Sequence, residues 1–249
     1  MIPQWPAPSG VHAWCSTREG GVSAAPYDTL NLGDHVGDDP SAVAENRRRF
    51  AQQLKARPVF LQQVHGRGVA RLAADTSDGT QADACWTTER GVACTMMVAD
   101  CLPVLLADRR GRVVGAAHCG WRGLAGEGGQ GVLEALWQEM RPEASEAGDM
   151  LAWLGPCIGP EAFEVGPEVR AAFVQGDAQA GACFRPHGDG KFLADLPALA
   201  RRRLAALGFT SVHGNDGSAS WCTVTNRSRF FSHRRDRVSG RLAAAAWLA

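Results

Sequence analysis

Three apolar runs constrain this chain most, because each leads into a cysteine or histidine and then, within two residues, into a glycine or proline. The runs are residues 58–64, 96–99 and 114–117, and the residues that follow them are His65, Cys101 and His118. A short apolar run bounded by turn residues is typical of a strand buried on both faces. If the three strands lie side by side, their ends bring two imidazoles and a thiol to one edge of a sheet. We therefore predict a functional site at His65, Cys101 and His118.

This set of side chains fits a metal centre. A catalytic zinc site takes three protein ligands and keeps a fourth position for water or substrate. The same residues also fit a Cys–His hydrolase, in which Cys101 is the nucleophile, His118 is its base and backbone amides near Gly120 stabilise an oxyanion. In a third, structural interpretation, Cys101 is a buried apolar residue. The first two interpretations differ at His65, which only the metal site requires.

The composition excludes several classes of protein. Lys+Arg and Asp+Glu both number 26 in 249 residues, so the chain lacks the basic excess typical of a nucleic-acid-binding protein. No apolar run approaches the length of a transmembrane helix, and the N-terminal residues lack the pattern of a signal peptide. Eight cysteines without a CxxC pair indicate reduced thiols rather than a disulfide framework. We therefore expect a cytoplasmic protein with no nucleic-acid or membrane partner.

Local patterns predict one domain of mixed α and β structure over residues 1–249. Asp39-Pro40 and Asp195-Leu196-Pro197 each place a capping carboxylate before a proline in the first turn, and so each predicts the start of a helix. Further helices are expected at residues 132–140 and 167–174. Strands are expected at residues 11–17, 58–64, 94–99, 103–108, 114–118, 151–155, 222–225 and 230–233, with a hairpin turn at 109–112.

Five motifs, in order along the chain, resemble the YfiH family, which is also called the laccase-domain or polyphenol-oxidase family. They are Gln63-Val64-His65-Gly66, Ala99-Asp100-Cys101-Leu102-Pro103, Ala117-His118-Cys119-Gly120-Trp121-Arg122-Gly123, Gly155-Pro156-Cys157-Ile158-Gly159-Pro160 and Phe230-Phe231-Ser232-His233-Arg234-Arg235-Asp236. The resemblance covers residues 14–248. It places the family's zinc-binding His, Cys and His at His65, Cys101 and His118. Cys119, Cys157 and His233 depart from the family, which usually has Ala, a small residue and Tyr there.

The resemblance implies a zinc-dependent purine nucleoside phosphorylase, with copper as a possible alternative metal. Its implied substrates are phosphate and adenosine, inosine, guanosine or methylthioadenosine, and it implies adenosine deamination as well. The implied fold is a layered α+β domain with mixed β-sheets flanked by helices, similar to toxin cysteine hydrolases and usually monomeric. Copper-dependent phenol oxidation and peptidoglycan editing are further family labels. Seven histidines without an HxH pair argue against a multicopper oxidase, because imidazole is a preferred copper ligand.

Phosphorolysis needs cationic groups on phosphate and a proton donor to the leaving base. The candidates for the phosphate clamp are Arg47, on the expected buried face of the first helix, and Arg241. Gln63 is the candidate for a contact to the base or the ribose. Zinc deaminases usually carry an HxE motif whose Glu moves the proton. That motif is absent here, which leaves Cys101, Asp100 or a water molecule for this role.

Overall fold

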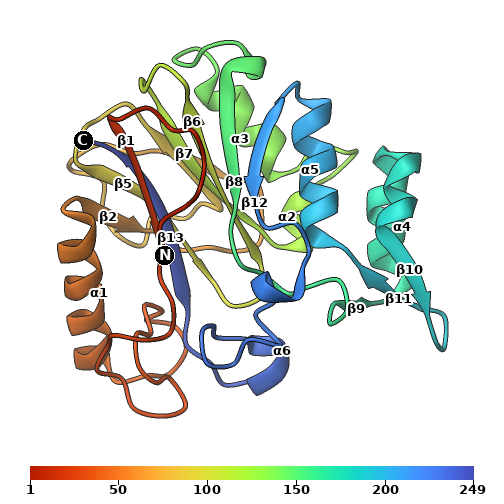
Figure 1. Ribbon diagram of the computed structural model, residues 1–249, viewed down its shortest axis with the longest axis horizontal. Coiled ribbons are helices and arrows are strands. Elements are labelled where there is room, and N and C mark those ends of the chain that lie inside the picture. The colour runs from red at the N-terminus through yellow and green to blue at the C-terminus, as the bar shows by residue number, and fades with distance from the viewer.

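Two β-sheets stacked face to face form the centre of the computed structural model, which describes residues 1–249 (Figure 1). The four-stranded sheet has the order β1 (Val11–Cys15), β13 (Leu242–Leu248), β5 (Val92–Val98), β2 (Arg57–Phe60). The six-stranded sheet has the order β12 (Ser211–Gly214), β8 (Met150–Leu154), β6 (Leu102–Asp108), β7 (Val114–Cys119), β4 (Ala84–Thr87), β3 (Val69–Arg71). A small sheet joins β10 (Phe184–His187), β11 (Lys191–Ala194) and β9 (Glu164–Val165). Both large sheets contain parallel and antiparallel pairs, which confirms the predicted fold class.

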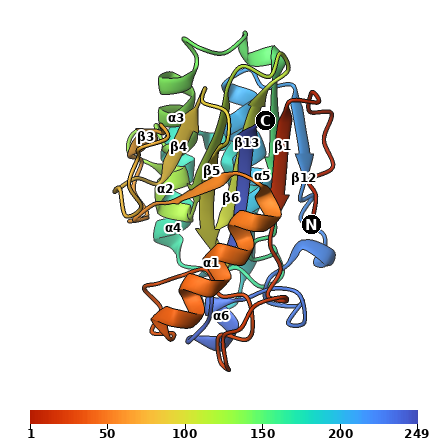
Figure 2. The same ribbon diagram turned by 90° about the vertical axis from the view of Figure 1, so that its left-hand side faces the viewer.

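Helices cover the outer faces of the two large sheets (Figures 1 and 2). Helix α1 (Pro40–Leu54) packs on the four-stranded sheet, whereas α3 (Val132–Met140) and α5 (Leu196–Ala206) pack on the six-stranded sheet. The other helices are α2 (Trp121–Ala125), α4 (Pro167–Gly176) and α6 (His233–Asp236), and 3-10 helices occur at Ala147–Asp149, Ala178–Cys183 and Ala219–Trp221. None of the helices combines the length and the apolar character that crossing a bilayer requires.

The stacking explains why the central strands are apolar without interruption. Successive side chains of a strand point to opposite faces of its sheet. In β5, Cys94 and Met96 therefore enter the core between the sheets, where they join Leu105 of β6. Ala93 and Met97 point to the other face and pack with Phe50 of α1 and its neighbours. Both faces are covered, so a polar residue at any of these positions would lose its hydration.

The predicted helix starts are confirmed by their capping hydrogen bonds. Asp39 accepts a hydrogen bond from the Ser41 amide at the start of α1, and Asp195 accepts one from the Ala198 amide at the start of α5. Each carboxylate satisfies an amide that has no partner within the helix. The eight cysteines form no disulfide, as expected for reduced thiols.

The last two predicted strands are wrong. Residues 222–225 form a turn, joined to the rest only by an isolated bridge between Cys222 and Cys157. Phe230 and Phe231 are fully buried, but they anchor a small apolar cluster instead of joining a ladder, and α6 begins directly after them. The strand at this end of the chain is β13, all seven residues of which are buried between β1 and β5.

Candidate metal centre

The three predicted residues line one cavity of about 440 Å³. We call their end of the cavity the inner end, because His118 is buried there, although Cys101 is half-buried and His65 is exposed. The ligand atoms of His65, Cys101 and His118 all lie within 4.8 Å of one another, and no other group of three or more such side chains is close enough to hold a metal ion. Cys101 Sγ is 3.8 Å from His65 Nε2, and the two imidazoles meet edge to face with centroids 4.8 Å apart. The prediction that these residues converge is therefore confirmed.

The predicted meeting place, one edge of a single sheet, is wrong. His118 belongs to β7 of the six-stranded sheet. His65 follows β2 of the four-stranded sheet after a short loop, because β2 ends at Phe60 rather than at Val64. Cys101 lies in the tight connection between β5 and β6, where the chain crosses from one sheet to the other. The site thus lies at the common end of the two stacked sheets.

A buried carboxylate that the motif analysis missed holds both histidines. Asp83 has no exposed surface, and its Oδ1 lies 2.9 Å from His118 Nδ1 and accepts a hydrogen bond from the His65 amide. Its Oδ2 accepts a hydrogen bond from the Gly66 amide. A carboxylate on Nδ1 fixes the tautomer and leaves Nε2 to bind a metal ion. The sequence carries one signal of this role, a lone aspartate between apolar residues at the start of β4.

Gly120 makes room for the cluster. A Cβ atom at this position would lie 3.0 Å from Cys101 Sγ and 3.1 Å from His65 Cδ2. Real side chains rarely make contacts this tight, because close-packed neighbouring atoms move little to accommodate an added carbon. Glycine is therefore required where the loop after β7 passes the two donors.

The thiol and the imidazole at this end change each other's pKa. Burial raises the pKa of Cys101, but the charge of His118 and hydrogen bonds from His118 and His65 outweigh burial and lower the pKa of Cys101 to about 6. Burial lowers the pKa of His118, whereas Cys101 and Asp83 raise it to about 9. With no ion bound, the pair is therefore a thiolate and an imidazolium at neutral pH.

These observations fit a single bound metal ion. Two imidazoles and a thiolate are the donor types that zinc takes, and the side facing the cavity is open for a fourth ligand. A three-ligand metal site uses both histidine rings of this cluster, whereas a Cys–His dyad uses only one. The structure also places Cys119 away from the cluster, because His118 and Cys119 point to opposite faces of β7 and Cys119 is fully buried in the core.

Two of the predicted substrate contacts are occupied by the protein itself. The Gln63 side chain lines the cavity, but its amide donates to the Met97 carbonyl and accepts from the Met97 amide, both at 2.8 Å. Arg47 donates to the Leu32 carbonyl, pairs with Asp34 at 3.1 Å and does not line the cavity. The expectation that Arg47 clamps phosphate is therefore corrected: α1 directs this guanidinium to the loop that carries Asp34.

Arg241 does reach the cavity. Its Nη1 atom donates to the carbonyls of Ser239 and Gly240, and no carboxylate pairs with it. Burial lowers the pKa of this guanidinium and outweighs the opposing attraction of Cys101 and Asp100, because removing a charge from water destabilises it. A half-buried cation with unused donors is a suitable anion site.

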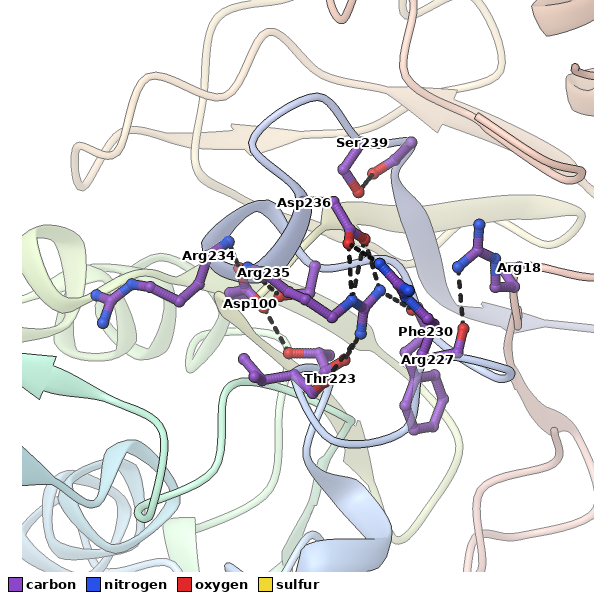
Figure 3. Close-up of polar contacts among 12 residues, drawn as sticks. Arg18, Asp100, Thr223, Arg227, Phe230, Arg234, Arg235, Asp236 and Ser239 are labelled. Atoms are coloured by element: carbon purple, nitrogen blue, oxygen red, sulfur yellow. Dashed lines mark hydrogen bonds and ion pairs between the residues drawn. The ribbon is translucent and has the colours of Figure 1, made fainter. Parts of the chain in front are cut away.

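Asp100 ties three segments to the cluster (Figure 3). Its carboxylate accepts hydrogen bonds of 2.6 Å from Thr223 Oγ1 and from the Arg234 amide of α6. Its carbonyl accepts a hydrogen bond from the Ile158 amide. Each carboxylate oxygen thus accepts one hydrogen bond, and Asp100, which directly precedes Cys101, holds α6 at this end of the cavity.

The outer part of the cavity has an apolar wall and a basic mouth. Trp121 of α2, Ile158 and Phe163 line the wall, and the Arg234 guanidinium lies 5.7 Å from the centre of the Phe163 ring. His35, His233 and Arg237 are exposed and line the mouth. Sequence patterns could not have grouped these residues, because they lie on segments far apart in the chain.

Comparison with known proteins places the whole chain in one family. Residues 12–249 match the family described as multi-copper polyphenol oxidoreductase laccase. A purine nucleoside phosphorylase of Pseudomonas aeruginosa is 52% identical over 249 residues, covering 100% of this chain and 98% of the relative. Purine nucleoside phosphorylase YfiH of Escherichia coli is 50% identical over 250 residues with the same coverage.

Solved structures share the fold. A Neisseria meningitidis protein superposes with a TM-score of 0.91 at 44% identity, covering 100% of this chain and 98% of that chain. YlmD of Geobacillus stearothermophilus superposes with a TM-score of 0.83 at 31% identity, covering 96% and 92%.

Proposed function

Because this chain belongs to the laccase-domain family that includes YfiH, we propose that it cleaves purine nucleosides by phosphorolysis, with one zinc ion held by His65, Cys101 and His118. One observation carries the proposal: a three-donor cluster and the unpaired Arg241 guanidinium line the same cavity. The names of the relatives from Pseudomonas aeruginosa and Escherichia coli support it. In this proposal the protein acts as a monomer of one domain, residues 1–249.

The metal is proposed as zinc rather than copper on the basis of the donors. A bound zinc ion would act as a Lewis acid and lower the pKa of a bound water. A multicopper mechanism needs several copper sites, and this chain has one cluster of three donors. The eight unbonded cysteines support a reducing, cytoplasmic location.

In the proposed reaction, a phosphate oxygen forms a bond to C1′ of the ribose while the bond from C1′ to the purine nitrogen breaks. The electron pair of that bond leaves with the base, which takes up a proton, and the products are ribose 1-phosphate and the free purine. Arg241 holds the phosphate and balances its charge, since its free donors face the cavity.

The apolar wall is proposed to hold the base. Trp121, Phe163 and Ile158 line the cavity, and the two aromatic rings are proposed to stack on the purine. Gln63 lines the cavity and keeps one N–H beyond its two bonds to Met97, so it is proposed to contact the base or the ribose. Such a wall suits adenosine, inosine, guanosine and methylthioadenosine alike, because stacking does not distinguish between purines.

Adenosine deamination is proposed as a second reaction of the same cavity, in which water attacks C6 and ammonia leaves. The carboxylates of Asp83 and Asp100 accept hydrogen bonds at both oxygens. Asp83 is fully buried, which leaves Asp100, Cys101 or a water molecule to carry the proton. Phosphorolysis is the main activity in this proposal.

The test is incubation of the zinc-loaded protein with adenosine or inosine, with and without phosphate, and separation of the products by chromatography. Adenine that forms only with phosphate is expected, at a rate that Cys101→Ala lowers by about a hundredfold or more, because the variant loses a metal ligand. Inosine formed from adenosine without phosphate would establish deamination. Equal inactivity of both proteins contradicts the proposal and leaves the phenol-oxidase, hydrolase and peptidoglycan-editing alternatives.

The phosphate clamp has its own test. Arg241→Ala is expected to raise the KM for phosphate about tenfold or more and to leave the KM for inosine within about twofold, since one charged hydrogen-bond donor is lost from the phosphate site. Arg90→Ala is the matched control, because Arg90 is exposed and lies outside the cavity. Equal increases in both KM values would contradict the assignment.

A further inference from the structure

Strained backbone is concentrated at the cavity. Five residues other than glycine have a positive φ, and three of them, His65, Asp100 and Arg237, line this cavity. Such conformations cost free energy and persist where the surrounding structure or the function requires them. His65 belongs to the donor cluster and Asp100 ties α6 to it. Arg237 (φ 61°) ends α6, where its amide donates to the His233 carbonyl, so its backbone has a structural role and only its side chain is left without one.

Arg237 differs from the arginines beside it. Arg234 donates to the carbonyls of Ala162 and Glu164, and Arg235 is turned toward Asp236 and donates to it (Figure 3). The guanidinium of Arg237 has no hydrogen bond, ion pair or aromatic partner in the chain, yet it lines the cavity mouth with His233. Packing therefore does not account for this side chain.

The carboxylates near the mouth do not neutralise it. Asp34 pairs with Arg47 and with His35. Asp236 pairs with Arg235 and Arg227. The cationic charge of Arg237 is therefore available to a ligand that enters the cavity.

The segment that carries Arg237 is held in place. The Arg234 amide donates to Asp100, and Ser232 caps α6 by accepting from the Arg235 amide. Because other residues fix α6, the backbone of His233 and Arg237 need not be ordered on binding, which lowers the entropic cost.

We propose that Arg237 and His233 form a second phosphate-binding subsite at the mouth of the cavity, separate from Arg241. Its ligand is a phosphate group, either free orthophosphate on its way to the reaction or the 5′-phosphate of a purine nucleoside monophosphate. This subsite deepens the proposed function, because it lies in the cavity assigned to purine nucleosides. A guanidinium and an imidazole provide the charge and the donors that a phosphate group binds.

The test is calorimetric binding of orthophosphate, adenosine and AMP to the zinc-loaded protein. Arg237→Gly is the decisive variant, because glycine adopts the positive φ without strain and only the guanidinium is lost. Arg237→Lys keeps the charge and is expected to restore part of the affinity, and Arg90→Ala controls for net charge. Loss of the charged contact is expected to weaken phosphate-group binding about tenfold or more.

The two phosphate sources give different results. If the ligand is a nucleotide, AMP binds the wild type at least about tenfold more tightly than adenosine, and Arg237→Gly removes this preference while adenosine binding is unchanged. If the ligand is orthophosphate, the variant weakens orthophosphate binding and AMP shows no advantage. Unchanged binding of all three ligands overturns the subsite. Binding that depends on Arg237 in a protein without phosphorolysis would keep the subsite and reject the proposed reaction.

Discussion

The two ends of the cavity are built differently. At the inner end, His118 and Asp83 are buried, and the exposed His65 is held through its backbone amide by Asp83 and packs close to Gly120. At the mouth, His35, His233 and Arg237 are exposed, and a single carboxylate, Asp100, ties α6 to the sheets. The chemistry is thus placed on the rigid part of the fold, and recognition is left to short segments. Substitutions at one end should leave the other unchanged.

The largest expected effect comes from the buried carboxylate at the inner end. Asp83→Asn replaces an acceptor with an amide that cannot accept from all of the donors around it, so the orientation of His118 is lost. Zinc affinity is expected to fall about 10–100-fold, as measured by competition with a chelator. Asp108→Asn is the matched control, because Asp108 is also buried and pairs with Arg112 away from the cavity. Unaltered zinc affinity in Asp83→Asn would show that the strands alone hold the histidines.

A second prediction concerns pH at the inner end. The pKa of Cys101 is about 6 and that of His118 is about 9, so one proton must leave the pair when a metal ion binds between these values. Zinc affinity is expected to rise about tenfold per pH unit from pH 6 to 9, and more steeply below pH 6, where the thiol also loses a proton. Zinc titrations across this range check the slope. An affinity independent of pH would contradict the thiolate–imidazolium pair.

In the metal-free protein, the same two pKa shifts also change the free energy of unfolding with pH, in opposite directions. The lowered pKa of Cys101 adds stability that is present above pH 9 and is lost as the pH falls through 6. The raised pKa of His118 adds stability that is present below pH 6.5 and is lost as the pH rises through 9. Between about pH 6.5 and 9 these slopes cancel, because the native and unfolded pairs bind the same number of protons. Between about pH 6.5 and 9, this pair should therefore change zinc affinity with pH but leave the free energy of unfolding unchanged.

The smallest expected effect comes from the mouth. Thr223→Val removes the hydroxyl that donates to Asp100, which loosens α6 and the mouth residues it carries. The KM for phosphate is expected to rise about fivefold, since a hydrogen bond to a carboxylate contributes about 1.5 kcal/mol or more and only part of it acts on the mouth residues. Zinc affinity should not change. Thr225→Val is the control, because Thr225 contacts only its own turn. A loss of zinc from Thr223→Val would mean that the two ends are not independent.

The sequence by itself determined the central strands and the donor residues. Uninterrupted apolar runs are required where a strand is covered on both faces, and the capping pairs Asp39-Pro40 and Asp195-Pro197 mark helix starts through local hydrogen bonds. His65, Cys101 and His118 follow such runs and could be identified from them. These features depend on neighbours along the chain, which a sequence displays directly.

Only the tertiary structure decided how the site is assembled. The stacking of two sheets, rather than the edge of one, brings His65 and His118 together, and Asp83 joins them from a third segment. Arg47 fell on the predicted buried face, but its distance from the cavity depends on how α1 packs. Contacts between distant segments are set by the packing of whole layers, and periodicity within one segment carries no information about them.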